Sequence, residues 1–203
     1  MSGTAEADAG TALAEALEPI ARVIMDTLQS DPPPGIEGPA AIDQDTDAFD
    51  AAYGNPVDLG YRHPLHLLSL VIASRLYLIA DTLEGIALLG RYGTESRPPV
   101  SYSAQAIART ALDAAAFCYW MAEPDIGHDE RVKRLLQDTM HEVKSGNRVA
   151  QYAAKDGILL PSNVDELIDM CDAYHVPYQQ PYHEGDLPRV GKRPSAGSIM
   201  APS

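Results

Sequence analysis

The helical period of two consecutive long segments is the strongest constraint on the fold. From residue 64 to residue 91, apolar side chains recur at steps of three and four residues, which places them on one face of a helix. They are Leu65, Leu68, Ile72, Leu76, Ile79, Leu83 and Ile86, followed by Gly90. The next segment, residues 101–122, is rich in alanine and has few polar residues after its first turn. We therefore expect a hairpin of two core helices, with residues 101–122 at the centre.

Three further segments have helical signals. In residues 11–29 the apolar positions follow the same steps, and Pro19 predicts a kink or a second start. Residues 128–157 begin with acidic side chains, which stabilise the positive end of a helix dipole, and they continue with an apolar stripe. Residues 162–174 predict a short helix with Ser162 as its N-cap.

The remaining segments lack a helical period. Residues 30–62 combine prolines and glycines with an acidic run, which predicts a long, partly disordered loop. Residues 176–203 predict an extended tail, interpreted either as a docking segment or as a free end lying against the acidic N-terminal region. The expected fold is an all-α, single-domain bundle of four to five helices. Its parts are an N-terminal helix and acidic loop (1–62), the bundle core (63–175) and the tail (176–203).

The charge distribution limits the partners. The formal net charge is −14, and residues 1–60 hold twelve acids against one base, Arg22, whereas residues 61–203 hold seventeen acids against fourteen bases. Binding to DNA or anionic lipid draws on clustered Lys and Arg, so we expect neither DNA nor a membrane as partner. Residues 129–155, with six bases and four acids, predict the only net-basic helix.

Three features predict a cytoplasmic location. The longest apolar run is interrupted by Arg75, Asp81 and Glu84, so we expect no membrane span. The acidic start of the chain is unlike a signal peptide. Cys118 and Cys171 lie far apart in apolar helical contexts, which favours buried thiols in a reducing compartment over a disulfide.

A polar row along the net-basic helix is the first candidate site. Arg134, Asp138, His141, Ser145 and Arg148 follow steps of four and three residues, so they share one helix face. A guanidinium matches phosphate oxygens, and an imidazole exchanges protons near neutral pH. The alternative interpretation is a solvated helix face with an ion pair between Arg134 and Asp138.

The spacing of Arg134 and His141, with six residues between them, resembles the R-x4-6-H motif of HEPN-type ribonucleases. Residues 108–114 and 131–136 also resemble uncharacterised bacterial helical proteins related to HEPN domains, and the resemblance covers roughly residues 101–157. It implies an all-helical domain in which Arg134 holds the scissile phosphate of RNA and His141 handles the 2′-hydroxyl proton, without a metal, across a dimer interface. The resemblance supports the fold more than the activity, because such families include members without the catalytic pair.

Arg109 and Asp113 lie one turn apart on the apolar segment 101–122. We interpret them as a charged pair in a largely buried setting that fixes the register of the helices. The alternative is a polar pocket between helices, in which both residues would support the candidate site together with Asp138 and Arg148.

No metal or cofactor is expected. Asp138 and His141 have the spacing of half a di-metal site, but the chain has no Glu-x-x-His pair, which such bundles use twice. Motifs of nucleotide-binding loops and of standard hydrolases are also absent from the sequence. The remaining histidine pairs are interpreted as capping or surface residues: His63 with His66, and His175 with His183.

The function that the sequence favours is non-catalytic: a helical interaction protein, a homodimer or a partner of another protein, that associates through the exposed surface of residues 64–157. The alternative is a HEPN-like, metal-independent ribonuclease of the defence or toxin type, with Arg134 and His141 as catalytic residues and RNA as partner. The sequence leaves open whether the chain is an enzyme.

Overall fold

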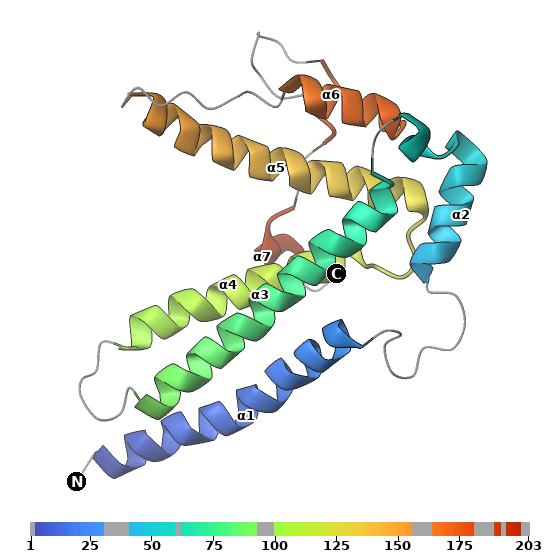
Figure 1. Ribbon diagram of the computed structural model, residues 1–203. Coiled ribbons are helices and arrows are strands. Elements are labelled where there is room, and N and C mark those ends of the chain that lie inside the picture. The colour runs from blue at the N-terminus through green and yellow to red at the C-terminus, as the bar shows by residue number, and fades with distance from the viewer. Residues whose placement is uncertain are drawn as a thin grey trace. The chain divides into compact units, whose positions relative to one another are not determined.

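The chain folds into helices, as expected (Figure 1). The computed structural model describes residues 3–30, 41–59, 62–92, 100–155, 164–180, 189–191 and 194–199. Within these ranges, a single bridge between Gln179 and Arg189 is the only β-type pairing. The elements are α1 (Gly3–Gln29), α2 (Ala41–Tyr53), the short 3₁₀ helix η1 (Pro56–Leu59), α3 (Pro64–Tyr92), α4 (Val100–Met121), α5 (His128–Lys155), α6 (Val164–Ala173) and α7 (Ala196–Ile199). The all-α fold class is confirmed.

The long helices begin and end close to their expected bounds, because their apolar period and their end signals agree. Pro64 is the first residue of α3, a position where its missing N–H costs nothing. The N-terminal helix α1 starts at Gly3, well before residue 11, and Pro19 lies inside it. The predicted N-cap of α6, Ser162, lies outside the described residues.

The long loop predicted for residues 30–62 is wrong in its second half. Residues 41–53 form α2, and residues 56–59 form η1. Residues 31–40 of the predicted loop lie outside the described ranges. The acidic run predicts a loop because the sequence of α2 has little apolar period. In the structure Phe49 is completely buried and anchors this helix.

The chain divides into two compact units, which cut across the three segments expected from the sequence. The first unit comprises residues 1–38, 70–120 and 196–203, and so holds α1, α7 and most of α3 and α4. The second unit comprises residues 39–69 and 121–195, and so holds α2, the start of α3, α5 and α6.

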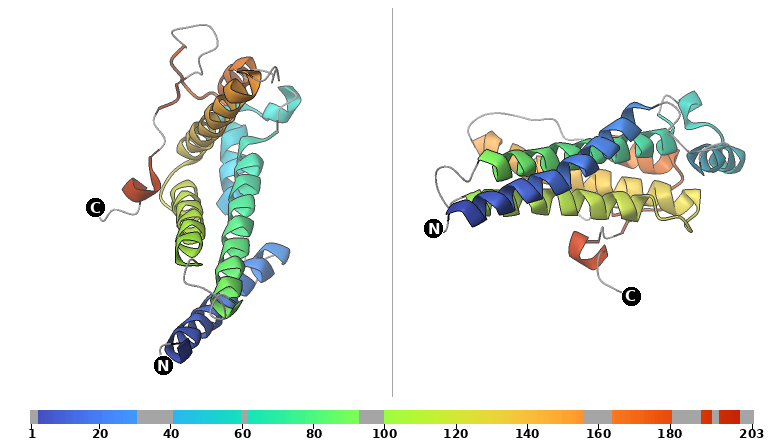
Figure 2. Two further views of the ribbon diagram at one scale, coloured as in Figure 1. Left: turned by 90° about the vertical axis from the view of Figure 1, so that its left-hand side faces the viewer. Right: turned by 90° about the horizontal axis from the view of Figure 1, so that it is seen from below.

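The core of the first unit joins α1, α3 and α4, which run alongside one another (Figure 2). Ile79 of α3 packs with Ala114 and Cys118 of α4, and Ile24 of α1 covers this cluster. The small side chains of α4 let the helices approach closely. The predicted core hairpin therefore forms.

The prediction that residues 101–122 lie at the centre is right for one face of α4 and wrong for the other. Ala111, Ala114 and Phe117 are buried, but Leu112 and Tyr119 are 55% and 66% exposed. An alanine-rich sequence does not reveal how many sides of a helix are covered.

The core of the second unit is built on α5. Val132, Leu135 and Leu136 are completely buried, as is Leu65 at the start of α3. The apolar stripe predicted for this helix is thus confirmed in its described part. Cys171 of α6 is buried with them.

A capping motif ends α6 and places one histidine. The N–H of Val176 donates to the carbonyl of Cys171 (2.9 Å), and the N–H of His175 donates to that of Asp172 (3.2 Å). These two bonds, with His175 at φ 55°, form a Schellman motif. His175 therefore holds a backbone conformation that non-glycine residues adopt rarely.

The tail is not free where the structure describes it. Val176 and Val190 are buried in the second unit, and the side-chain amide of Gln137 on α5 donates to the carbonyl of Val190 (3.2 Å). The interpretation of the tail as a free end is wrong for these residues, because isolated valines leave no periodic signal.

We expect Gly191→Ala to destabilise the second unit by about 1–3 kcal/mol. Gly191 has φ +114°, and a Cβ there would lie 2.7 Å from the Gln137 side-chain nitrogen, which would have to leave Val190. Gly54→Ala is the control, because Gly54 has φ +82° but open space around a Cβ. Hydrogen exchange of the α5 amides measures the loss of stability in both variants. An equal cost for the two variants would show that the contact with Gln137 contributes nothing.

By length and composition, one helix of the described residues could cross a membrane, namely residues 64–91 of α3. The expectation of no membrane span, which rests on Arg75, Asp81 and Glu84, stays a prediction. The core helix of a soluble protein passes the same test, and Ile79 and Ile86 of α3 are buried, but only 28% of the most apolar window of α3 is buried in the protein. The cytoplasmic location stays a prediction.

Candidate functional site

The predicted polar row on α5 does not present its side chains together. Arg134 is half-buried with a side chain 11% exposed, Asp138 is buried, and His141 is exposed. Arg148 and Ser145 belong to α5, but their side chains lie outside the described residues. The described members of the row therefore differ in their access to a substrate.

The Arg134 guanidinium is engaged by two carboxylates. Its Nη1 donates to Glu123 Oε2 at 2.7 Å, and its Nε donates to Glu130 Oε1 at 3.2 Å. The second carboxylate also accepts from Lys133 Nζ at 2.8 Å, and these bonds lower the pKa of Glu130, although burial opposes that shift. The charge of Arg134 is thus largely balanced inside the protein. A phosphate would have to displace these bonds.

Arg109 and Asp113 form the expected pair, but not the expected setting. Their Nε and Oδ2 atoms lie 3.9 Å apart, with side chains 84% and 47% exposed. The pair lies on the outer face of α4, so the predicted burial is wrong. Such an exposed pair at i and i+4 contributes about 0.3–0.5 kcal/mol and neither fixes the register of a core nor lines a buried pocket.

The two cysteines are structural thiols, as predicted. Cys118 and Cys171 are buried and form no disulfide. Burial, with a smaller effect of the neighbouring Asp172 carboxylate, raises the pKa of Cys171 to about 12. A thiol with this pKa is not a nucleophile near neutral pH.

A cluster of aromatic and histidine rings around α2 is the feature that the sequence analysis missed. Phe49 and Tyr53 of α2 meet histidines from three other segments of the second unit. The Phe49 ring centroid lies 5.3 Å from that of His63 and 6.1 Å from that of His128, both edge to face, and Tyr53 stacks on His175 at 4.8 Å. The signal available in the sequence was the number of histidines, but His63, His128 and His175 lie 47 to 112 residues apart and have no common motif.

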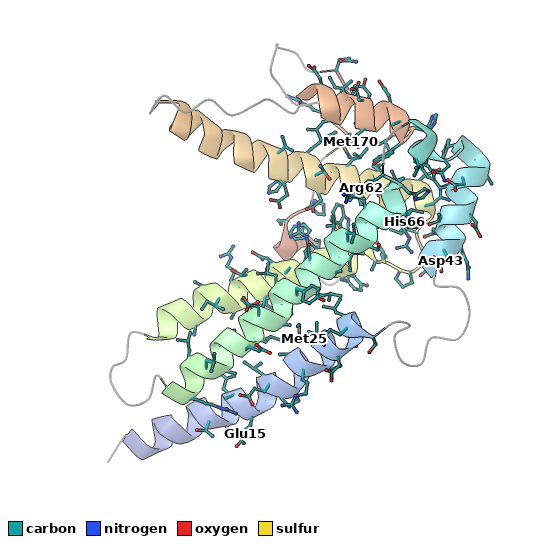
Figure 3. The ribbon with its side chains drawn as sticks, viewed as in Figure 1. Glu15, Met25, Asp43, Arg62, His66 and Met170 are labelled. Carbon is teal, nitrogen blue, oxygen red and sulfur yellow. The ribbon has the colours of Figure 1, made fainter. Side chains whose placement is uncertain are left out.

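The ring cluster is not a metal site. No group of three or more His, Cys, Asp or Glu side chains within the described ranges could hold a metal ion. His63 uses Nε2 toward Asp50 Oδ1 (3.2 Å) and Nδ1 toward the N–H of Leu65 (3.3 Å), so it has no nitrogen left for a ligand bond. The rings pack against each other, which makes the cluster an attachment for α2. In Figure 3 the label Asp43 marks α2 and the label His66 marks the first turn of α3.

Most of the large apolar side chains that are exposed lie on the first unit. Of the eleven large apolar side chains that are exposed in the described residues, nine belong to this unit. α3 supplies four and α4 supplies two. The full set is Leu13, Ile20, Val23, Leu70, Tyr77, Leu78, Leu88, Leu112 and Tyr119.

On α1 the exposed apolar residues form a regular seam, which we call the outer seam: Leu13, Ala16, Ile20, Val23 and Thr27. The steps alternate between three and four residues, as in a helix that packs along another helix. A second series with the same steps lies beside it and faces the protein; it contains the fully buried Ala14 and Ala21 and the half-buried Leu17, Ile24 and Leu28. α1 thus has two neighbouring apolar faces, of which the chain itself covers one.

Comparison with known protein families, with curated proteins and with solved structures finds no match to this chain.

Proposed function

We propose that this protein is a non-catalytic helical interaction protein that associates with a second copy of itself through the first unit. The observation that carries the proposal is the outer seam of α1. Leu13, Ile20 and Val23 are 45%, 52% and 64% exposed although their spacing is that of a packed helix. A monomer has no use for such a seam, whereas a helical partner would cover it.

The outer seam has three large apolar side chains, so a stable interface would also cover exposed apolar residues of α3 and α4. At roughly 150–200 Å² per large side chain, about half of it exposed, the nine apolar residues of the first unit present on the order of 800 Å². Each partner of a standard protein interface contributes about 800 Å². In α3, moreover, only 28% of the most apolar window is buried in the protein. A second copy would remove this surface from water.

The charge pattern favours a second copy only at the outer seam. At −14, two copies repel each other, so their contact has to avoid the acidic side chains. The outer seam contains no charged residue, and Glu15, Arg22 and Asp26 lie on a third face of α1, about 120° around the helix from the centre of the seam. A symmetric dimer uses the same patch on both copies, so one uncharged seam serves both sides of the contact.

The ribonuclease alternative gains no support from the geometry. Arg134 already bonds Glu123 and Glu130, and His141 stands exposed two turns further along α5. RNA cleavage would need a free guanidinium beside the imidazole at one phosphate. We therefore retain self-association as the proposed function.

The test is a charge placed in the outer seam. The double variant Ile20→Glu/Val23→Glu changes the formal charge by −2, and so does Arg22→Glu, which lies on the same helix but outside the seam. We expect the double variant to weaken the dimer at least a hundred-fold, because a buried carboxylate without a partner costs several kcal/mol, and Arg22→Glu to weaken it less than ten-fold. Equal weakening by both variants would show that net charge, not the seam, controls association. Circular dichroism checks that both keep their helix content.

A further inference from the structure

Histidines contribute much of the contact that holds helix α2 on the rest of the second unit. Beyond α2 itself, the rings of Phe49 and Tyr53 pack against the rings of His63, His128 and His175. Two ion pairs join α2 to other segments as well, Asp50 with His63 at 3.2 Å and Asp45 with Arg131 at 2.8 Å. An attachment made of imidazoles depends on whether those rings carry a charge.

His63 has two structural roles, of which the capping of α3 requires a neutral ring. As the residue before Pro64 it caps α3: its carbonyl accepts from the N–H of Leu67 (3.0 Å), and its Nδ1 accepts from the N–H of Leu65 (3.3 Å). Since Nδ1 accepts, the ring proton sits on Nε2 and is donated to Asp50 on α2. The side chain of His63 is 2% exposed, so it couples the cap of α3 to the position of α2 away from water.

Protonation of His63 would break this arrangement. A second ring proton would place an N–H on Nδ1, directed at the N–H of Leu65, and a positive charge at the positive end of the α3 dipole. The Asp50 carboxylate, half-exposed, attracts that charge, while His66 at 5.2 Å opposes it. The other titratable side chains that contact the rings of α2 are His128, Asp129 and His175.

We propose that His63 is a proton-sensitive latch: neutral, it holds α2 on the second unit, and protonated, it releases α2 and uncovers the apolar site of Phe49. This inference is independent of self-association, which concerns the first unit. It gives the protein a response to mild acidification that the proposed function alone does not include.

The direction of the response follows from the balance at His63. Burial lowers its pKa below the ordinary 6.5 more strongly than the carboxylate of Asp50 raises it. The attached state therefore binds fewer protons than the released state. The stability that the neutral His63 gives to the attached state is fully present above about pH 6.5, the ordinary histidine pKa. It is lost as the pH falls from 6.5 toward the lowered pKa of His63 in the attached state.

Hydrogen exchange of the α2 amides, corrected for the intrinsic rate at each pH, tests the latch. Between pH 7.5 and pH 5.5 we expect the opening constant of residues 41–53 to rise several-fold, up to a limit of about ten-fold set by an ordinary histidine in the open state. In His63→Asn, whose amide can still cap α3 but does not titrate, the rise should disappear. In His141→Asn, which removes an exposed histidine of α5, it should remain.

An opening constant that is the same at both pH values, or that rises equally in His63→Asn, would overturn the proposal. If His63→Asn does not fold, the latch is tested in the unmodified protein by NMR titration. The chemical shifts of the His63 imidazole protons give the pH at which this ring is half protonated. A midpoint below pH 6.5 supports the latch. A midpoint at or above 6.5 contradicts it, because protonation would then strengthen the attachment.

Discussion

Replacing Phe49 with alanine is expected to destabilise the second unit by about 3–5 kcal/mol, the range for deleting a buried aromatic ring. Phe49 is completely buried and is the one large apolar side chain in the core among the α2 side chains that the structure describes, residues 43–53. Its ring contacts Tyr53, His63 and His128, so the variant removes the centre of the ring cluster. Hydrogen exchange of the α5 amides between Val132 and Met140 reports the free energy of opening of this unit.

Val57→Ala is the matched control for Phe49→Ala. It deletes apolar atoms from the same unit, three residues after Gly54, but its side chain is 55% exposed. We expect it to change the free energy by less than about 0.5 kcal/mol. A loss for Phe49→Ala no greater than that of Val57→Ala would mean that α2 contributes nothing to the stability of the unit.

Arg131→Ala is the second variant with a large expected effect, about 2–4 kcal/mol. Its guanidinium lies 2.8 Å from Asp45 of α2 and also donates to the carbonyl of Met121 at 3.2 Å, with a side chain only 12% exposed. Removing it leaves the Asp45 carboxylate, itself 22% exposed, and the end of α4 without this cation. The lost stability should appear as faster hydrogen exchange of the backbone amides of both α2 and α5.

Arg109→Ala is the control for Arg131→Ala because it removes the same type of residue from an ion pair. The Arg109–Asp113 pair is exposed, and its loss should cost no more than about 0.5 kcal/mol. If the two variants lost equal stability, burial would not distinguish the two pairs, and the attachment of α2 by Arg131 would be refuted.

The long helices could be predicted from the sequence because each element carries its own signal. In α3 the apolar period, Pro64 at the first position and Arg91 in the last turn agree. In α5 the carboxylates of the first turn and the apolar stripe that includes Val132 and Leu136 also predict the same helix. Local propensity and packing therefore specify the same bounds.

Helix α2 could not be predicted because its partners lie elsewhere in the chain. Its sequence is acidic, and among the described side chains of residues 43–53 Phe49 is the large one that is buried in the core. The groups that hold it, His63, Arg131 and His175, are 13 or more residues away from their contacts. A pattern search along the chain does not detect such contacts, and propensity alone favoured a loop.

The candidate site shows the same limit. The spacing of Arg134 and His141 is visible in the sequence. The ion pairs of Arg134 with Glu123 and Glu130 are not, because they depend on how α5 follows the turn after α4. Likewise, apolar steps in α1 predicted a helix but not which face it buries. Two interleaved series with the same spacing, one beginning at Leu13 and one at Ala14, are indistinguishable until the neighbours are placed.

The mass of the unmodified protein in solution tests the proposed self-association most directly. Sedimentation equilibrium over a hundred-fold range of concentration, at an ionic strength that screens the −14 charge, should show an average mass that rises from the monomer toward twice that value. The Ile20→Glu/Val23→Glu variant should remain a monomer over the same range. A strictly monomeric mass for the unmodified chain at the highest concentration would contradict the account, because the exposed apolar surface of the first unit would then have no second copy to cover it.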